Sequence, residues 1–443
     1  MASITILGNY LIESANKLPK QGWGVRIEAN RILEIAPNEV LLQKYPDHLL
    51  DARNQIIVPG FINTHMHMYS SLTQGVYFKK NWADVHDKLV KFIWAEVEDK
   101  LDHTAIKAAT KLCSAMLIRN GITTIADIME APYALPGGLD VAAEVIDQSG
   151  LRGVMMFEAT ERVNPENGQL GLQENEQFIR QNPTGKGRVS GMMCVHTTFS
   201  CSLPFLSQAR LLADQLGSYI HMFVSESRFE PLHCLRTYNA LPFEVYESIG
   251  FLKPDVLASM AVHVRGREIP ILAQYGVNIA HIPLSAANPG VGIAPISDYL
   301  AHGINVGLTT YPFFNYFETM RATIWMHRAH NEVSGIMPVK TVYQMATEGA
   351  ARALGMDSYV GTIAEGKLAD LLLINTNYIP RITPENLLDL FVFHSNPPDI
   401  DTVIIDGEIV MKNKRVLTVD EESAKEEVRQ LNQKLWPTIT TTN

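Results

Sequence analysis

The chain carries an apolar run that closes on two histidines, Val58-Pro59-Gly60-Phe61-Ile62-Asn63-Thr64-His65-Met66-His67. On a β-strand, positions two apart point to the same face, so the rings of His65 and His67 are predicted to lie side by side. Two imidazoles on one face indicate part of a catalytic zinc or iron site. Such a site takes about three protein ligands and keeps one position open. The function therefore depends on whether the rest of the chain supplies the other ligands.

The residues on the two sides of this run differ in pattern. Over residues 4–58, apolar and polar residues alternate between turn signals, which predicts a small antiparallel sheet. From residue 59 onward, short apolar strands alternate with longer helical patterns, which predicts βα units and a parallel sheet. The candidate strands are 57–63, 122–127, 152–157, 190–195, 218–224, 256–261, 277–281 and 304–309. This order predicts an α/β fold built on a (β/α)8 TIM barrel.

The sheet-like pattern returns near residue 363, in the stretches 369–374 and 402–407, and a charged helical pattern follows over 421–435. We therefore expect two domains. Residues 1–58 and 363–443 would form a composite β domain, a small β-sandwich built from both termini. Residues 59–362 would form the TIM-barrel catalytic domain, inserted between them. A length of 443 residues suits one barrel-sized domain and one smaller domain.

Composition limits the classes of partner. The formal net charge of -10, without a run of Lys or Arg, argues against nucleic acid. No apolar stretch approaches about 18 residues, so no membrane span is expected. The N-terminal residues lack the basic and apolar regions of a signal peptide. The four cysteines lack CxxC spacing, which favours reduced, packed thiols in a cytoplasmic protein.

The 58–67 run resembles the opening of the amidohydrolase superfamily, and residues 361–370 look like the strand with which that superfamily returns to its β domain. Residues 120–127 and 290–307 also fit. The similarity is closest to the branch that deaminates or dechlorinates N-heterocycles. It implies a barrel, a small-molecule substrate and hydrolysis of non-peptide C–N bonds, and it leaves a homodimer open.

The resemblance also implies a metal site that this sequence fills only in part. In that branch, one zinc or iron is held by both histidines of the HxH motif, a histidine on strand five, another on strand six and an aspartate on strand eight. Here Phe223, Met260 and Tyr311 occupy the last three places. We therefore expect His65 and His67 to bind metal at low occupancy. No cofactor is favoured, and one Zn or Fe is the alternative.

Other residues of the family pattern remain. Glu226 matches the catalytic glutamate, and His196 and His281 match places near the substrate, so these three are the predicted catalytic residues. The residues predicted to contact the substrate are Tyr311, Phe223, Met260, His263 and His221. His221 shares a strand face with Phe223 but lies about 6.5–7 Å further down the strand, too far to take over as the metal ligand without a register shift. Tyr311 is either a phenol donor or a plug, and Phe223 and Met260 either pack or form an apolar floor for a planar ligand.

Three functions follow. Metal lowers the pKa of bound water from about 15.7 to about 7, whereas a positioned acid or base contributes about 10²–10⁴-fold. Without metal, water-activated hydrolysis is therefore poorly supported. We predict an amidohydrolase-like enzyme that acts on a small cyclic or guanidine-like nitrogenous compound. It would catalyse an isomerisation, an elimination or a cyclisation, with Glu226 and the histidines transferring protons. One alternative is a metal-dependent hydrolase of C–N or C–Cl bonds that recruits His221, His263 or His281. The other is a non-catalytic ligand-binding barrel.

Overall fold

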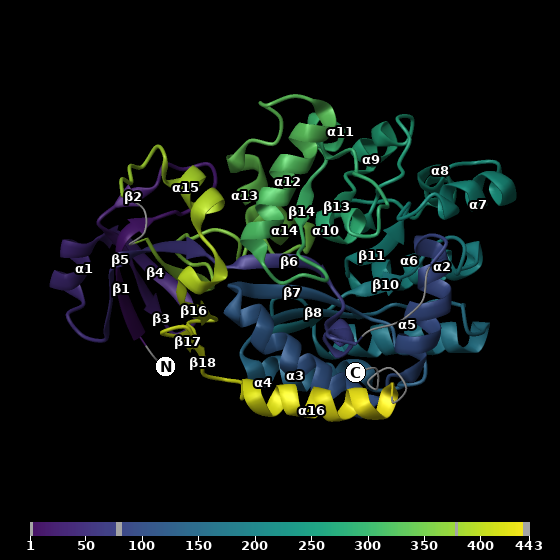
Figure 1. The fold of residues 1–443 in the computed structure, drawn as a ribbon, viewed down its shortest axis with the longest axis horizontal. Helices are drawn as coiled ribbons and strands as arrows, with labels where there is room; N and C mark the ends of the chain where they lie inside the picture. The colour runs from purple at the N-terminus through teal and green to yellow at the C-terminus, as the bar shows by residue number, and fades with distance from the viewer. Residues whose placement is uncertain (1–2, 77–81, 377–379, 437–443) are drawn as a thin grey trace, which may run out of the picture.

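The computed structural model describes residues 3–76, 82–376 and 380–436 and has the α/β architecture that the sequence predicts (Figure 1). Within these residues, one mixed sheet has nine strands in the order β18-β17-β16-β15-β5-β1-β3-β4, with β2 paired to β1. Its strands are β1 (Ser3–Leu11), β2 (Lys20–Gln21), β3 (Trp23–Glu28), β4 (Arg31–Pro37), β5 (Leu49–Pro59), β15 (Leu371–Asn375), β16 (Ile400–Ile405), β17 (Glu408–Lys412) and β18 (Arg415–Val416). Strands from the two ends of the chain therefore share one sheet.

Strand β5 is the reason that this sheet is continuous. It pairs in parallel with β1 on one side and antiparallel with β15 on the other, where Leu371 lies opposite Pro59. The sequence predicted a small β-sandwich; in the structure the hydrogen-bonded path runs without a break through eight strands, and β2 joins it beside β1. An alternating pattern fixes which face of a strand is buried, but it does not fix which strands become neighbours.

Two parallel sheets carry the rest of the predicted strands. The first has the order β6-β7-β8-β9 and the second β10-β11-β12-β13-β14. Their bounds are β6 (Phe61–Met66), β7 (Ile122–Met129), β8 (Arg152–Phe157), β9 (Val189–Gly191), β10 (Met193–Val195), β11 (Ile220–Val224), β12 (Val256–Met260), β13 (Asn278–His281) and β14 (Val306–Leu308). A parallel bridge between Ala159 and Val195 links the two sheets. At the opposite edges, the Thr64 hydroxyl donates to the carbonyl of Leu308, so a side chain makes this contact between β6 and β14.

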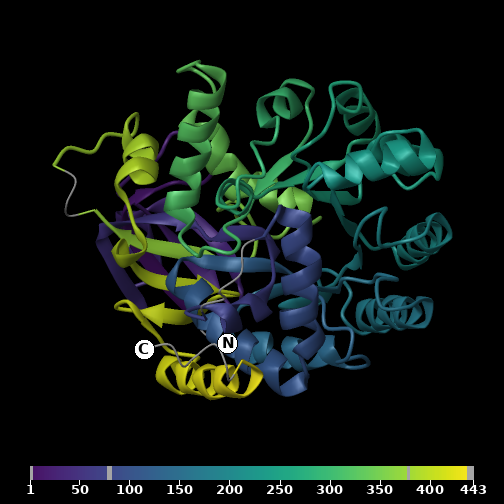
Figure 2. The same ribbon diagram turned by 45° about the vertical axis from the view of Figure 1, so that its right-hand side comes forward.

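Helices follow most of these strands and lie on the outer side of the parallel sheets (Figure 2). They are α1 (Asn38–Lys44), α2 (Val85–Lys88), α3 (His103–Arg119), α4 (Gly138–Ser149), α5 (Pro165–Gln181), α6 (Leu203–Leu216), α7 (Phe229–Tyr238), α8 (Pro242–Ser248), α9 (Ile269–Tyr275), α10 (Pro283–Ala287), α11 (Ile296–Ala301), α12 (Tyr316–Asn331), α13 (Val339–Ala346), α14 (Glu348–Ala353), α15 (Leu387–His394) and α16 (Glu421–Leu435). Shorter turns are η1 (Met68–Thr73), the π-helix η2 (Leu89–Val97), η3 (Glu98–Lys100) and η4 (Pro397–Asp399). Several starts are capped locally; for example, the Asp102 carboxylate accepts from the Ala105 N–H at α3.

Gly60 separates β5 of the large sheet from β6 of the first parallel sheet. Its N–H donates to the carbonyl of Asp370, 3.0 Å away. A Cβ atom at this position would lie 2.1 Å from Oγ1 of Thr123, so the backbone approaches its neighbour more closely than any side chain allows. The predicted strand 57–63 is therefore two strands, β5 ending at residue 59 and β6 beginning at residue 61.

A buried ion pair also connects the large sheet to the parallel sheets. The guanidinium of Arg152 on β8 donates two hydrogen bonds to the carboxylate of Asp370, at 2.8 and 3.0 Å, and a third to Asp406 at 3.0 Å. The Arg152 and Asp370 side chains are almost fully buried. Such a pair constrains how the two parts of the chain meet, because either partner alone would be a buried, uncompensated charge.

The last described helix packs away from the large sheet. Helix α16 runs beside α3 (Figure 1), and Lys111 on α3 forms an ion pair with Glu427 at 2.6 Å. Arg119 at the end of α3 pairs with Glu421. Ala424 and Val428 of α16 are buried in the main hydrophobic core. The end of the segment 363–443 thus covers the helical layer around the first parallel sheet.

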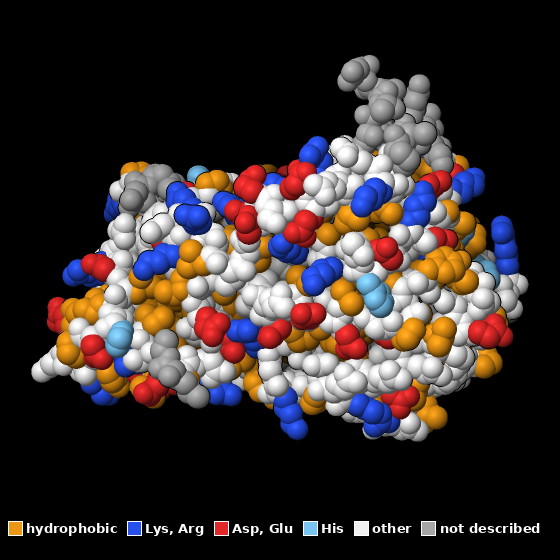
Figure 3. Space-filling view, turned by 90° about the horizontal axis from the view of Figure 1, so that it is seen from below, with side chains coloured by type: hydrophobic (Ala, Val, Ile, Leu, Met, Phe, Trp, Pro, Cys, Tyr) orange, Lys and Arg blue, Asp and Glu red, His pale blue; other side chains and the backbone are white. Residues whose placement is uncertain are grey.

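The surface mixes charges of both signs. Figure 3 shows one face on which Lys, Arg, Asp and Glu side chains are interspersed among apolar ones. Among the helices of the described residues, none is long and apolar enough to cross a membrane. The cysteines Cys113, Cys194, Cys201 and Cys234 are buried and not disulfide-bonded. The buried thiols agree with the packing role that the sequence predicts for the cysteines.

Candidate functional site

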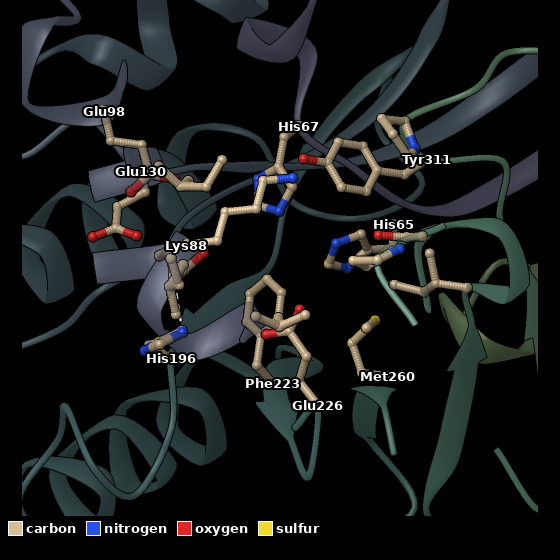
Figure 4. A pocket seen from close by; sticks show the side chains of 18 of the residues that line it. His65, His67, Lys88, Glu98, Glu130, His196, Phe223, Glu226, Met260 and Tyr311 are labelled. Carbon is tan, nitrogen blue, oxygen red and sulfur yellow. Dashed lines mark ion pairs between the residues drawn. The ribbon is translucent and has the colours of Figure 1, made fainter. Parts of the chain in front are cut away.

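A cavity of about 140 Å³ lies where the carboxyl ends of β6, β11 and β12 meet the segment after β14. Seven of the ten predicted site residues line it, as Figure 4 shows for the side chains around its centre: His65, His67, His196, Phe223, Glu226, Met260 and Tyr311. The segment from α2 into η2 forms the opposite wall through Val85, Lys88, Leu89 and Ile93. One cavity therefore brings together most of the strand-end residues that the sequence singled out.

His67 has a defined protonation pattern. Its Nδ1 lies 2.7 Å from the carbonyl oxygen of Ile128. A carbonyl can only accept a hydrogen bond, so Nδ1 carries the proton and Nε2 keeps its lone pair. Burial lowers the pKa of His67 to about 4, so the ring is neutral near pH 7. A neutral imidazole with a free lone pair is a proton acceptor or a metal ligand.

His65 is held from behind. Its Nδ1 lies 2.9 Å from Oγ of Ser259 and 3.3 Å from Nε2 of His221, and neither of these residues lines the cavity. Burial, and then the nearby rings of His67 and His221, lower the pKa of His65 well below its usual range. Its ring is therefore neutral as well.

The three residues in the expected ligand places surround these two histidines. The ring centroid of Phe223 lies 5.0 Å from that of His65 and 5.8 Å from that of His67. The Tyr311 ring lies 4.9 Å from His67 and 5.8 Å from His65. Met260 lines the same cavity. The wall is therefore largely aromatic and apolar next to the HxH pair.

The donor set does not fit the mononuclear metal site that the family resemblance implies. Phe223 has no lone pair to offer, and the thioether of Met260 and the phenol of Tyr311 are not the imidazole and carboxylate ligands of such sites. Only His65 and His67 remain of the implied ligands. Among the described residues, no group of three or more His, Cys, Asp or Glu side chains is arranged to hold a metal ion.

Strained backbone marks the ends of two cavity strands. Ser225 has a φ of 49°, Met260 a φ of 71° and Ala261 a φ of 44°, all in the left-handed region that residues with a Cβ rarely adopt. Ser225 precedes Glu226 directly, so the bend follows β11 at the point where the chain delivers this carboxylate to the cavity. Backbone strain of this kind clusters at functional sites.

Glu226 is the carboxylate closest to the predicted role. It lines the cavity, and burial raises its pKa to about 7, opposed by the charge of Lys88. Both its protonated and its ionised forms are therefore populated near neutral pH, which allows a carboxyl group both to donate and to accept a proton. The prediction that Glu226 lies in the pocket agrees with its position.

The sequence analysis missed a second set of carboxylates on the other side of the cavity. Glu98, Glu130 and Glu158 line it together (Figure 4 labels the first two). The guanidinium of Arg162 forms ion pairs with Glu130 and, at 3.5 Å, with Glu98. The Tyr69 hydroxyl donates to Glu98 at 2.6 Å. Glu130 and Glu158 each follow directly after an apolar strand, and a charged residue there is the signal that could have indicated them.

These carboxylates share one buried region with His196. Burial, followed by repulsion from Glu130 and Glu98, raises the pKa of Glu158 well above its usual range. Nε2 of His196 lies 3.5 Å from Glu158, and its Nδ1 lies 2.6 Å from the Ser200 hydroxyl. Burial, and then the charge of Arg162, lower the pKa of His196 to about 3. His196 is therefore a neutral hydrogen-bonding residue at the cavity wall.

Three predicted site residues do not line this cavity. His221 lies behind His65, with its Nδ1 3.2 Å from Sγ of Cys194. The Nε2 atom of His281 lies 3.3 Å from Nε2 of His327, a buried contact with helix α12. His263 is half-buried, in the loop that follows β12. Strand register and loop geometry determine where these three imidazole rings lie. Neither can be deduced from the sequence pattern.

The chain is similar to known proteins over most of its length. The family described as "Amidohydrolase family" matches residues 56–410. A 5'-deoxyadenosine deaminase of Methanosphaera stadtmanae is 31% identical over 382 residues, 85% of this chain and 87% of that protein. A 5-methylthioadenosine/S-adenosylhomocysteine deaminase of Thermococcus onnurineus is 31% identical over 421 residues, 94% of this chain and 95% of that protein. The chain belongs to the amidohydrolase family, which confirms the resemblance seen in its motifs.

Solved structures support the same fold. An adenosine deaminase from Xanthomonas campestris with bound zinc superposes with a TM-score of 0.88 at 19% identity, covering 98% of this chain and 99% of that one. An atrazine chlorohydrolase from Arthrobacter aurescens in complex with zinc has a TM-score of 0.85 at 20% identity, covering 97% and 100%. At these identities the likeness shows a shared fold.

Proposed function

We propose that the cavity is the active site of an enzyme that transfers protons on a small, planar nitrogenous compound without a catalytic metal. The proposal includes closure of the two parallel sheets into one (β/α)8 barrel, whose carboxyl-terminal face carries the active site. The observation that carries it is the pairing, in one cavity, of a carboxyl group with a pKa of about 7 and two neutral imidazoles. Around the two imidazoles, Phe223, Met260 and Tyr311 stand in the places where the family resemblance implies metal ligands.

Three cavity residues, Phe223, Glu226 and His67, have roles in this reaction. A flat cyclic or guanidine-like substrate packs on the ring of Phe223, which supplies apolar contact without charge. The protonated carboxyl of Glu226 donates a proton to one substrate atom, and Nε2 of His67 accepts a proton from another. The proton then returns from the His67 imidazolium to the Glu226 carboxylate, which restores both groups. The net change is a proton shift, as in an isomerisation, or the acid–base steps of an elimination or cyclisation.

A second candidate function rests on the sequence relatives. The two proteins compared above are described as deaminases of 5'-deoxyadenosine and of 5-methylthioadenosine/S-adenosylhomocysteine, and each match covers most of both chains. On that basis, the substrate would be a nucleoside-like N-heterocycle and the reaction a metal-dependent deamination. Such a site would have to recruit His221, His263 or His281, and the two ring nitrogens of His221 already have partners within 3.3 Å.

One experiment separates the two candidates. The protein is purified without chelator, its zinc and iron are measured by mass spectrometry, and ammonia release from 5'-deoxyadenosine is followed with and without 1,10-phenanthroline. We expect well under one equivalent of metal and no chelator-sensitive ammonia release. A stoichiometric metal whose removal abolishes deamination would refute the metal-free proposal and establish the second candidate. A broad ligand screen in which compounds bind but none is converted would favour a ligand-binding barrel instead.

A further inference from the structure

A buried chain of hydrogen bonds runs behind His65. The Sγ atom of Cys194 lies 3.2 Å from Nδ1 of His221. Nε2 of His221 lies 2.5 Å from Oγ of Ser259, and Oγ of Ser259 lies 2.9 Å from Nδ1 of His65. All four side chains are at most 1% exposed. Of the four, only His65 lines the cavity.

The register of three adjacent strands builds this chain. Cys194 on β10 lies directly opposite His221 on β11. Ser259 on β12 lies opposite Phe223, two residues beyond His221 on the same strand face. Ser259 thus reaches back to His221 and across to His65. Phe223 occupies one of the three substituted ligand places. It is also the register partner of Ser259, the serine that contacts His65.

The hydrogens along the chain can be assigned. The Ser259 hydroxyl has one hydrogen, so it donates to one ring nitrogen and accepts an N–H from the other. O–H donors make shorter contacts than N–H donors. The 2.5 Å contact therefore corresponds to O–H donation from Ser259 to His221, and the 2.9 Å contact to N–H donation from His65 to Ser259. The remaining hydrogen of His221 is then on Nδ1, directed at Cys194, whose thiol points to the Val195 carbonyl 3.8 Å away.

We propose that Ser259 and His221 are positioning residues that fix the tautomer of His65, with its proton on Nδ1 and its lone pair on Nε2 facing the cavity. Cys194 completes the chain by accepting from His221. The Ile128 carbonyl imposes the same tautomer on His67. The cavity then presents two imidazole lone pairs of known direction, one fixed by a backbone group and one by a side-chain relay.

The tautomer can be measured without any substrate. In protein labelled with ¹⁵N-histidine, two-bond ¹H–¹⁵N spectra distinguish protonated from unprotonated ring nitrogens, and a His65→Gln variant identifies the His65 signals. We expect Nδ1 of His65 to be protonated and Nε2 to be unprotonated, as for His67. A protonated Nε2 on His65 in the unmodified protein would overturn the proposal, whatever the activity.

Variants then test which side chains impose the tautomer. Ser259→Ala leaves His65 Nδ1 with only the 3.3 Å contact to His221, so we expect its two tautomers to mix. Ser259→Thr keeps the hydroxyl and should restore one tautomer. Ser114→Ala is the matched control, because Ser114 is a fully buried serine whose Oγ has no partner among the described residues. An unchanged His65 spectrum in Ser259→Ala, or an equal change in Ser114→Ala, would exclude Ser259 as the positioning residue.

The use of this lone pair in catalysis rests on the proposed function, whereas the tautomer does not. Once a converted substrate is known, Ser259→Ala should lower kcat by about 10- to 100-fold, the loss typical of removing a hydrogen-bond partner that orients a metal-binding histidine. KM should change less than kcat, because Ser259 does not touch the cavity. A fall in kcat that Ser259→Thr does not rescue would argue against the hydroxyl as the cause.

Discussion

The ring of Phe223 stacks on the ring of His67, with centroids 5.8 Å apart and an angle of 13° between the two planes. A side chain without lone pairs thus lies against the histidine that the family resemblance makes a metal ligand. The cavity keeps its imidazoles but places an apolar surface beside them. The proposed proton-transfer chemistry follows from this difference: the apolar ring of Phe223 stands where the family resemblance implies a ligand of a metal ion.

Restoring the family's ligand types should restore metal binding. We expect the triple variant Phe223→His, Met260→His and Tyr311→Asp to retain about one equivalent of zinc after dialysis, because it then offers the imidazole and carboxylate ligands that zinc prefers. Mass spectrometry of the dialysed protein measures this. The control is Phe223→Leu, which stays apolar and should retain no more zinc than the parent. Equal zinc in parent and triple variant would show that the substituted residues do not limit binding.

Glu226 should be required for turnover in a way that depends on pH. Glu226→Gln removes the proton donor and should lower kcat by about 10²–10⁴-fold. In the parent, the donor form is the protonated carboxyl, so the rate should fall as pH rises through about 7, the pKa that burial gives this group. Glu166→Gln, an exposed change on α5, is the control. A rate that instead rises through pH 7 would make Glu226 the base, and unchanged turnover in Glu226→Gln would remove it from the mechanism.

Asp127 should make stability depend on pH. Burial raises its pKa to about 7, above the value of about 3.9 in an unfolded chain. The folded state therefore holds more protons than the unfolded state between these pH values, and its stability falls as pH rises from about 4 to about 7. Asp127→Asn keeps an oxygen that can accept from the Met68 N–H and removes this loss. We expect the variant to gain up to about 4 kcal/mol over the parent at pH 8, and almost nothing at pH 4.

Urea unfolding at the two pH values measures that difference. Asp140→Asn, at an exposed position in the first turn of α4, serves as the control and should show no such pH-dependent gain. If Asp127→Asn destabilised the protein equally at both pH values, Asp127 would be ionised throughout and the predicted shift of its pKa would be wrong.

The buried pair between Arg152 and Asp370 should be stabilising only as a pair. Arg152→Met leaves the Asp370 carboxylate buried without its cation, which should cost about 3–5 kcal/mol in the free energy of unfolding. The double variant Arg152→Met and Asp370→Asn removes both charges and should recover a large part of that loss. Denaturant titration of the parent, the double variant and both single variants, Arg152→Met and Asp370→Asn, gives the coupling energy. A double variant no more stable than Arg152→Met would mean that packing, and not charge, makes Arg152 important.

Local periodicity predicted many of the elements accurately. The predicted strand 122–127 corresponds to β7 (Ile122–Met129), and 152–157 corresponds to β8 (Arg152–Phe157). Helix 421–435 was predicted with the observed bounds. Such segments are decided by residues near in sequence, because apolar spacing selects which face is buried. The break at Gly60 was missed, because it depends on Thr123, a residue that is distant in sequence.

The cavity was predictable in part for the same reason. Its HxH strand and Glu226 belong to motifs that are read locally. Glu130 and Glu158 meet only because β7 and β8 are adjacent strands, and single residues after two strands carry no motif. The expectation that His221 contacts substrate followed from strand parity. Its actual partners, Cys194 and Ser259, come from the strands on either side, so only the register between strands reveals them.

The single residue between β5 and β6 has a mechanical consequence. Gly60 is pinned by a hydrogen bond to Asp370 and by its approach to Thr123, and His65 lies five positions further along the same backbone. Gly60 thus fixes where the strand that carries the HxH pair begins relative to the nine-stranded sheet. The opposite wall, the segment from α2 into η2, is held by no β-ladder, so we expect adjustment to an entering ligand to occur there.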